Sequence, residues 1–412
     1  MPEFLKLQPP EDALQQFLES LPEDSRTEPE RIPTEDALNR VLAEAISAPH
    51  PLPPFARTTV DGYAVLAADT YGASERLPAY LEIVGEVSMG QTTPLTLQSG
   101  QAALVHTGGM IPAGGDAVVM IEDTQKAGAS EVEVLTAVAV GQNVLVEGED
   151  VKAGELVLEA GVKLRPQEIG GLMALGITSV EVARRPRVGI LSTGDEVVPP
   201  DVTPSAGQVR DVNSYTLNAL VRNAGGQPIL RGIIPDQYDA LFEATREAHR
   251  EDDVVIITAG SSVSTRDLTA QVIDALGDPG VLVHGVSIKP GKPTILAVAD
   301  GIPMIGLPGN PVSALVVAGY FVVPVIRQLL GLDKPAEAAR VSARMSVNVA
   351  AETGREDYLP VRLSATPQGL LAEPIYGRSN LIFTLVRADG LVRIPAEATG
   401  LDAGAEVEVR LF

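Results

Sequence analysis

Three glycine-rich loops in this chain follow apolar runs and lead into helical segments, which suits them to hold an oxyanion. They lie in "VGILSTGDE", "DVVIITAGSS" and "IPMIGLPGNPVS". Backbone N–H groups at a helix N-terminus carry a partial positive charge and attract anions. In the third loop Asn310 is a natural N-cap, Pro311 suits the first helical position, and Ser313 can donate from the first turn. Turn geometry alone accounts for one such loop, but three loops near Lys289 and Lys292 indicate ligand binding.

Carboxylates accompany these loops. Asp195 and Glu196 follow the first apolar run, Asp236 follows "PILRGIIP", and Asp267 opens the helix after "AGSS". Acids at the carboxyl ends of neighbouring strands can converge on one cation, and Mg²⁺ bridging to phosphate needs only one or two carboxylates. The alternative is that Asp267 caps its helix and the others face solvent. No loop is a P-loop, because the Gly-Lys-Ser/Thr sequence is missing.

Two further turn-rich segments are open to two interpretations. "FARTTVDGYAV" places Asp61-Gly62 where a tight hairpin turn is expected, yet its neighbours would also suit a contact reaching into another domain's crevice. "HTGGMIPAGGDAVVMIED" is equally turn-rich, and we expect its His106 to be packed or exposed rather than catalytic.

Composition excludes several kinds of site. The chain of 412 residues has no Cys and four His, so disulfides, thiolate sites and a cysteine nucleophile are excluded and a zinc site is not expected. The net charge of −23 disfavours nucleic acid and anionic membranes. The acidic N-terminus is not a targeting peptide, and the uncharged run 301–326 contains glycines and prolines typical of strand, turn and buried helix. We therefore expect a cytoplasmic protein.

The pattern of apolar residues predicts the order of the elements. Helical spacing predicts two helices within residues 1–50, the second over 37–46 behind a Thr34 cap. Short β-runs follow to about residue 145, and "RPQEIGGLMALG" predicts a further helix. From 183 to 331, apolar strands alternate with amphipathic helices, typical of a parallel sheet covered on both faces, with ligands beyond the carboxyl ends of its strands. Asn213 is expected to cap one helix, and Gly225 to end it. Residues 332–412 return to short β-runs, typical of a small barrel or sandwich.

Taken together, these segments resemble the molybdopterin molybdenumtransferase family, which includes bacterial MoeA proteins and the E domain of gephyrin. The resemblance runs from about residue 10 to 412. It rests on the order of "LPPFARTTVDGYAV", "HTGGMIPAGGDAVVMIEDT", "GEDVKAGELVLEAG", "VGILSTGDEVV", "DVNSYTLNALVRNAGG", "IKPGKP" and "GLPGNPVSAL".

The resemblance implies an α/β multidomain fold. It comprises an elongated, helical N-terminal domain (1–55 and 141–182), a β insertion domain (56–140), a parallel-sheet, molybdopterin-binding α/β domain (183–331) and a C-terminal β-barrel (332–412). It further implies a homodimer with a shared active site and an upstream molybdopterin adenylyltransferase as partner. The implied reaction converts adenylylated molybdopterin and molybdate to molybdenum cofactor and AMP, with Mg²⁺ assisting.

The resemblance also assigns roles to matching residues. Asp61, Glu196, Asp267 and Lys289 match functional positions, and Asp61 is expected to come from the partner chain beside Thr107. Glu196, Asp236 and Asp267 would place Mg²⁺. Residues expected to bind pterin, diphosphate or molybdate are Thr107, Asp150, Thr193, Gly194, Asp195, Asp236, Gly260, Ser261, Ser262, Lys292, Pro308, Gly309, Asn310, Ser313, Arg355 and Ser379, with Arg378 as an addition.

Some positions depart from the family pattern. Arg57 stands where an acid is usual, the loop before Asp267 is one residue shorter, and Gly285 replaces a frequent lysine. Two alternatives remain: a pterin-binding scaffold dimer without turnover, and a relative that uses tungstate. Turnover separates the first alternative from the enzyme, and relative oxyanion affinity separates the second.

Overall fold

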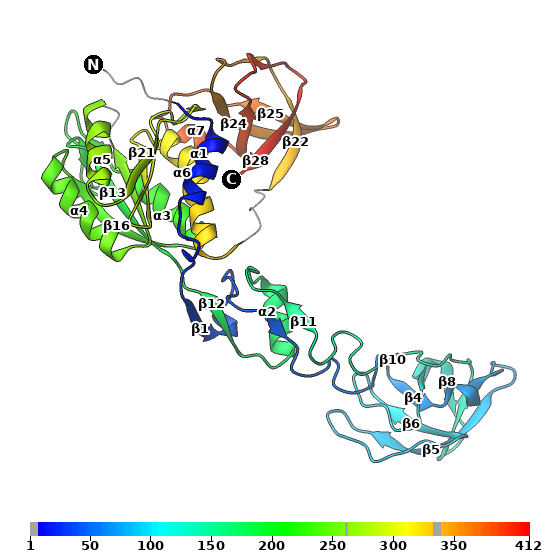
Figure 1. The fold of residues 1–412 in the computed structure, drawn as a ribbon. Coiled ribbons are helices and arrows are strands. Elements are labelled where there is room, and N and C mark those ends of the chain that lie inside the picture. The colour runs from blue at the N-terminus through cyan, green and yellow to red at the C-terminus, as the bar shows by residue number, and fades with distance from the viewer. Residues whose placement is uncertain (1–6, 260–262, 333–338) are drawn as a thin grey trace.

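Figure 1 shows an elongated molecule in which an α/β domain and a C-terminal barrel lie at one end and a β domain lies at the other, joined by a narrow arm. The computed structural model describes residues 7–259, 263–332 and 339–412, and for 263–267 it describes only the backbone. The two ends are therefore separate packing units along one chain.

The α/β domain is built on a six-stranded sheet with the order β16-β13-β17-β21-β20-β18. The first four strands run parallel, as predicted, whereas β20 and β18 form antiparallel pairs at the far side. The sequence suggested a fully parallel sheet, and the structure differs from that prediction in the antiparallel pairs of β20 and β18. The strands are β13 (Arg187–Thr193), β16 (Gln227–Ile234), β17 (Val254–Ala259), β18 (Pro279–His284), β20 (Ile295–Ala299) and β21 (Ile302–Pro308).

Helices cover both faces of this sheet because successive side chains of its strands alternate between two cores. Val254 and Ile256 pack with α1, α3 and α6, whereas Val255 and Ile257 pack with α4 and α5. One helix, α6, is long and apolar enough to cross a membrane, but 61% of its apolar window is buried inside the protein. It therefore serves as a core helix. The bounds are α1 (Pro10–Glu19), α3 (Asn213–Ala224), α4 (Tyr238–Glu251), α5 (Val263–Asp274) and α6 (Pro311–Leu329).

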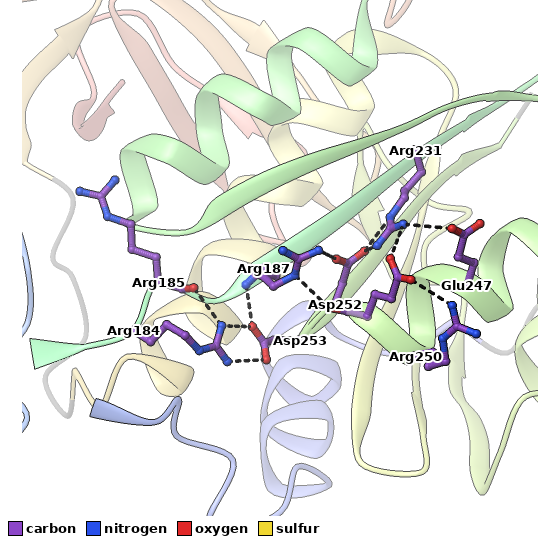
Figure 2. A network of polar contacts seen from close by, with 9 residues as sticks. Arg184, Arg185, Arg187, Arg231, Glu247, Arg250, Asp252 and Asp253 are labelled. Atoms are coloured by element: carbon purple, nitrogen blue, oxygen red, sulfur yellow. Dashed lines mark hydrogen bonds and ion pairs between the residues drawn. The ribbon is translucent and has the colours of Figure 1, made fainter. Parts of the chain in front are cut away.

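A network of ion pairs lies at the amino ends of β13 and β17, opposite the loops (Figure 2). Arg184 binds both carboxylate oxygens of Asp253, at 2.8 and 2.9 Å. The fully buried Asp252 side chain contacts Arg231 at 2.8 Å and Arg187 at 3.3 Å. A Cβ at Gly189 would lie 2.3 Å from the Asp252 carboxylate, so glycine is needed there. This network fixes the sheet at the end away from the site.

The prediction of a helix over residues 37–46 is wrong. A 3₁₀ turn, η1 (Thr34–Asp36), is followed by irregular chain and the short strand β2 (Ile46–Ser47). Ala37, Val41 and Leu42 are buried, whereas Leu38 and Ala45 are exposed. Backbone N–H groups of this segment bond to distant segments: Leu42 donates to the Val162 carbonyl, and Ala43 to that of Glu181. Tertiary partners thus override the local helical spacing.

The arm consists of short ribbons and one helix. β1 (Pro29–Pro33) pairs with β12 (Ser179–Ala183), and β2 pairs with β11 (Leu156–Leu158). The predicted helix over "RPQEIGGLMALG" is confirmed as α2 (Pro166–Ala174). The arm is thus less helical than expected, while α1 packs on the α/β domain instead.

The β domain is a single sheet with the order β7-β4-β6-β5-β9-β8, joined to the arm beside the β3–β10 pair. The sheet is antiparallel except for the β5–β6 pair. The bounds are β3 (Arg57–Thr58), β4 (Gly62–Val65), η2 (Ala67–Thr70), β5 (Ala79–Val87), β6 (Gln101–Val105), β7 (Ala117–Met120), η3 (Ile121–Asp123), β8 (Thr124–Lys126), β9 (Glu131–Val134) and β10 (Val144–Leu145).

The C-terminal region is a five-stranded barrel, closed by the β24–β26 pair. A short strand from the α/β domain, β19, pairs with the start of β24 and ties the two units together. The bounds are β19 (Ile288–Lys289), β22 (Arg340–Met345), β23 (Val349–Ala350), β24 (Glu356–Thr366), β25 (Gly369–Pro374), α7 (Phe383–Val386), β26 (Gly390–Ile394), β27 (Gly400–Leu401) and β28 (Glu406–Leu411), with β14 (Val197–Val198) and β15 (Val209–Arg210) after β13.

Candidate functional site

The predicted loops meet at the carboxyl edge of the sheet. β13, β17 and β21 are neighbours, and their ends are level: Ser192 is in register with Thr258, and Ala259 with Pro308. The loops after these strands therefore open on one edge, where ligands of such sheets bind. Gly260, Ser261 and Ser262, from the middle loop, lie outside the described residues, as does the side chain of Asp267. The prediction that Asp267 opens this helix is wrong, because α5 begins at Val263 and Asp267 lies inside it.

The loop after β13 combines a glycine of positive φ with two carboxylates. Gly194 has φ 139°, and a Cβ there would lie 2.8 Å from Glu196 Oε2, so the Glu196 side chain folds over a position that only glycine can occupy. The Asp236 N–H lies 3.3 Å from Asp195 Oδ1, which brings the loop after β16 alongside. Thr193, the last residue of β13, is 3% exposed, and its hydroxyl has no hydrogen-bond partner among the residues that the structure describes.

The loop after β21 has the predicted helix start. Asn310 is the N-cap of α6 and Pro311 its first residue, with no capping bond from the asparagine side chain. Ser313 is buried in the first turn. The Val312 N–H donates to the Ser379 carbonyl at 3.0 Å, so the barrel loop already uses one of the free N–H groups of this helix.

Asn213 was predicted as an N-cap, which is wrong: Val212 is the N-cap and Asn213 is the first residue of α3. Its Nδ2 donates to the Gly309 carbonyl at 2.8 Å, whereas its Oδ1 is buried and has no partner within the described part of the chain. Asn213 therefore ties α3 to the loop after β21 and leaves an acceptor there. Sequence reasoning missed this role because it assigned the amide to its own helix.

The bases of the site come from two domains. Lys289 lies on β19, and its Nζ is 2.9 Å from Asp357 Oδ2 on β24. Arg355 directly precedes β24 and pairs with Glu352. Lys292 lies in the turn after β19, where its carbonyl accepts from the Val286 N–H. Lys289, Arg355, Ser313 and Ser379 thus belong to adjoining elements at the junction of the α/β domain and the barrel.

The donor chemistry of the edge suits a hard cation. The carboxylates of Asp195, Glu196 and Asp236 offer only oxygen, and Asp195 and the Asp236 backbone are side by side. Among the described residues, no group of three His, Cys, Asp or Glu side chains is arranged to hold a metal. Mg²⁺ requires fewer, since it takes one or two carboxylates together with phosphate oxygens and water. These residues therefore fit Mg²⁺ shared with a phosphate, and not an all-protein metal cage.

Asp61 and Thr107 lie together in the β domain, at the other end of the molecule from the sheet edge (Figure 1). Asp61 Oδ1 accepts from the Thr107 N–H at 2.7 Å and from its hydroxyl at 3.1 Å. These bonds, chiefly the backbone one, lower the pKa of Asp61. His106 lies between two carboxylates, 4.0 Å from Asp61 and 2.7 Å from Glu86. The His106 side chain is partly exposed and lies next to Asp61. The residues around His106 in the sequence do not indicate this contact.

One chain does not bring all predicted site residues together. Asp61 and Thr107 belong to the β domain, and the exposed Asp150 lies in the arm, where its N–H donates to the Leu52 carbonyl. Arg378 is exposed in the loop that leads to Ser379. The roles assigned to all these residues stay predictions.

Comparison with known proteins identifies the family. Residues 8–176 match the MoeA N-terminal region (domain I and II), 189–328 a probable molybdopterin binding domain, and 342–412 the MoeA C-terminal region (domain IV). The chain belongs to the MoeA family. The molybdopterin molybdenumtransferases of Nostoc sp. and Bacillus subtilis are 36% and 34% identical to it, covering 94% and 93% of this chain and 89% and 90% of their own lengths.

Solved MoeA structures have the same fold. The molybdopterin biosynthesis MoeA protein from Pyrococcus horikoshii OT3 matches with a TM-score of 0.85 and 33% identity, covering 99% of this chain and 100% of its own. The predicted multidomain architecture, with its α/β sheet domain and C-terminal barrel, is therefore confirmed at the level of the fold.

Proposed function

We propose that this chain inserts molybdate into adenylylated molybdopterin and releases AMP. The chain is a transferase of molybdenum cofactor biosynthesis, as its membership of the MoeA family and its molybdenumtransferase relatives indicate. The finer assignment is supported by one structural observation: glycine-rich loops, carboxylates and lysine and arginine side chains from two domains adjoin at one sheet edge. Anionic substrates require such a basic, glycine-rich site in a protein that is otherwise acidic.

The residues at this edge would act mainly by binding and orienting. Lys289, Lys292 and Arg355, with the Ser313 and Ser379 side chains, would hold molybdate until two dithiolene sulfurs of the substrate replace two of its oxygens, which take up protons and leave as water. The loops after β13 and β21 would hold the diphosphate link, whose P–O bond breaks as water adds to one phosphorus, leaving AMP and the phosphate of the pterin. Because the sulfurs belong to the substrate, the absence of cysteine is consistent with this chemistry.

Glu196, Asp236 and Asp267 are the residues that we propose hold Mg²⁺. When bound, the cation would neutralise charge on the diphosphate and so favour departure of AMP. The family comparisons support the pterin substrate by name only, so magnesium and molybdate remain part of this proposal.

The separation of Asp61 from the sheet edge supports a homodimer. If the β domain of one chain contacts the α/β domain of its partner, Asp61 and Thr107 would complete the partner's site. We further propose a cytoplasmic location and a molybdopterin adenylyltransferase as the supplier of the substrate.

AMP release tests the proposed reaction. The protein is mixed with adenylylated molybdopterin, Mg²⁺ and molybdate beside a Glu196→Ala variant, with Glu159→Ala, an exposed arm residue, as the matched control. We expect molybdate-dependent AMP release from wild type and Glu159→Ala, and at least a hundredfold loss in Glu196→Ala, about the effect of removing a group that positions reacting charges.

Two results would favour the alternatives. Pterin binding without AMP release, with either oxyanion, would leave the scaffold as the better account. Release that depends on tungstate at lower concentration than molybdate would identify a tungstate-using relative.

A further inference from the structure

Lys289 and Arg355, two bases near the proposed oxyanion pocket, each form an ion pair with a carboxylate. Lys289 Nζ lies 2.9 Å from Asp357 Oδ2, and Arg355 pairs with Glu352. The two pairs differ in enclosure: the Asp357 side chain is 15% exposed, whereas that of Glu352 is 72% exposed. A solvated carboxylate exchanges readily with water, so only Asp357 is held against its base.

Backbone pairing fixes the position of Asp357. β19 and β24 run parallel with Lys289 in register with Asp357, and the Glu356 N–H donates to the Ser287 carbonyl at 2.9 Å. The Lys289–Asp357 contact is therefore set by strand register as well as by charge, and it joins the α/β domain to the barrel.

The neighbours of Asp357 in β24 are committed to a different cation. Side chains alternate across a strand, so Glu356 and Tyr358 point to the opposite side from Asp357. There Glu356 accepts from Arg393 Nε at 2.9 Å and from the Tyr358 hydroxyl at 3.1 Å. Arg393 therefore binds Glu356, whereas Lys289 binds Asp357.

We propose that Asp357 is a built-in counter-ion of Lys289, which an incoming oxyanion must displace, and that it thereby sets the affinity of the pocket for tetrahedral oxyanions. This inference rests on the proposed function, because it takes Lys289 as an oxyanion-binding base. A carboxylate and an oxyanion compete for one ammonium group, and the retained carboxylate repels the bound dianion. The charge of Lys289 is consequently offset while the pocket is empty, and the pocket binds oxyanions more weakly than its bases alone would allow.

Removing this carboxylate should tighten binding. We expect Asp357→Asn, which keeps the shape of the side chain, to lower the Kd for molybdate about tenfold, since one nearby charge is lost in a partly enclosed site. Isothermal titration of the full chain with molybdate, without pterin and at fixed low ionic strength, measures this change. Tungstate should show the same direction, and the gain should shrink as salt is added.

Glu408→Gln is the matched control. Glu408 forms an ion pair of similar length with Arg340, 2.8 Å, in the same barrel, and its replacement changes the net charge equally. Its Kd for molybdate should stay within about twofold of wild type, as expected for an exposed pair remote from the ligand. Equal tightening in both variants would mean that net charge alone acts, and would overturn the inference.

A Lys289→Met background tests the mechanism. If Asp357 competes for Lys289, the gain from Asp357→Asn becomes smaller when Lys289 is absent, because only the relief of carboxylate–oxyanion repulsion is left. A gain as large as that in the wild-type background refutes the competition. Unchanged or weaker binding by Asp357→Asn in the wild-type background would instead make Asp357 a positioning residue and overturn the proposal, provided circular dichroism shows a folded variant.

The binding experiment is separable from the test of the reaction. A wild type that binds molybdate but releases no AMP refutes the proposed transfer, while the comparison of Kd values still decides the role of Asp357. If neither wild type nor Asp357→Asn binds molybdate or tungstate, the counter-ion inference fails whatever AMP release shows.

Discussion

At the scale of single residues, Asp61 and Thr107 are hydrogen-bonded to each other within one chain. Thr107 donates twice to one carboxylate oxygen, and the pKa of Asp61 is lowered as a result. We expect Thr107→Val to raise the pKa of Asp61, because the hydroxyl donor is lost while the backbone N–H remains. Thr107→Ser, which keeps the hydroxyl, should retain the wild-type pKa.

An NMR titration of the carboxyl carbon of Asp61 measures this shift, with Asp61→Asn identifying the signal. A pKa that is the same in all three proteins would show that the hydroxyl does not stabilise the ionised form. In wild type the pKa of Asp61 lies below the ordinary value for an aspartate, so its carboxylate stays ionised throughout the neutral pH range.

At the scale of elements, the start of α2 is held by a capping box. Glu168 accepts from the Arg165 N–H at 2.8 Å and from its guanidinium at 2.5 Å, and these contacts lower the pKa of Glu168 to about 2. A depressed carboxyl pKa contributes stability that is full above the unfolded value of about 4.3 and is lost as pH falls toward 2. Glu168→Gln should therefore destabilise α2 by about 1 kcal/mol at pH 7.

Hydrogen exchange of the α2 amides, compared between variant and wild type at each pH, measures this difference. We expect the difference to close between pH 5 and pH 2, in the window set by the two pKa values. Glu159→Gln, an exposed acid in the same arm, should change nothing. A difference for Glu168→Gln that stays constant with pH would show that its charge does not stabilise the helix.

Elements whose signals are local could be predicted from the sequence, and those that depend on distant partners could not. Asn310 and Pro311 mark the start of α6 because cap and first-turn preferences are properties of a few neighbouring residues. Residues 37–46 have helical spacing as well, yet their N–H groups find carbonyls of residues 162 and 181. The apolar spacing identified Ala37, Val41 and Leu42 as buried, but Leu38 is exposed, and the spacing does not specify which carbonyl each N–H group binds.

The site shows the same division. The glycine, acid and lysine positions were predicted from motifs, whereas the Lys289–Asp357 contact spans 68 residues and two domains. The Asn213 bridge to Gly309 spans 96 residues and likewise depends on how α3 and β21 pack. No property of either residue's own neighbourhood specifies these contacts.

At the scale of the whole molecule, the proposed homodimer, with each site shared between two chains, makes a distinctive prediction. Asp61→Ala and Glu196→Ala should each be inactive as pure proteins, because each breaks every site of its dimer. Unfolded and refolded together in equal amounts, they should recover about a quarter of the wild-type AMP release, since half of the random dimers are mixed and each has one intact site. Recovery requires that Asp61 and Glu196 of one site come from different chains.

The same mixture without refolding is the control, and it should stay inactive if the dimers do not exchange. Failure to recover activity, with mixed dimers verified by differently tagged chains, would place both residues of a site in the same chain and contradict the shared arrangement.

The β domain lies at the end of a long, narrow arm. Among the described residues, two antiparallel passes of the chain, through β1–β12 and β2–β11, join this domain to the rest (Figure 1). A small rotation at the base of a long arm displaces its tip by a large distance, so the position of Asp61 depends on the geometry of these ribbons. Substitutions within the ribbons are therefore expected to move the β domain while the predicted site residues stay unchanged.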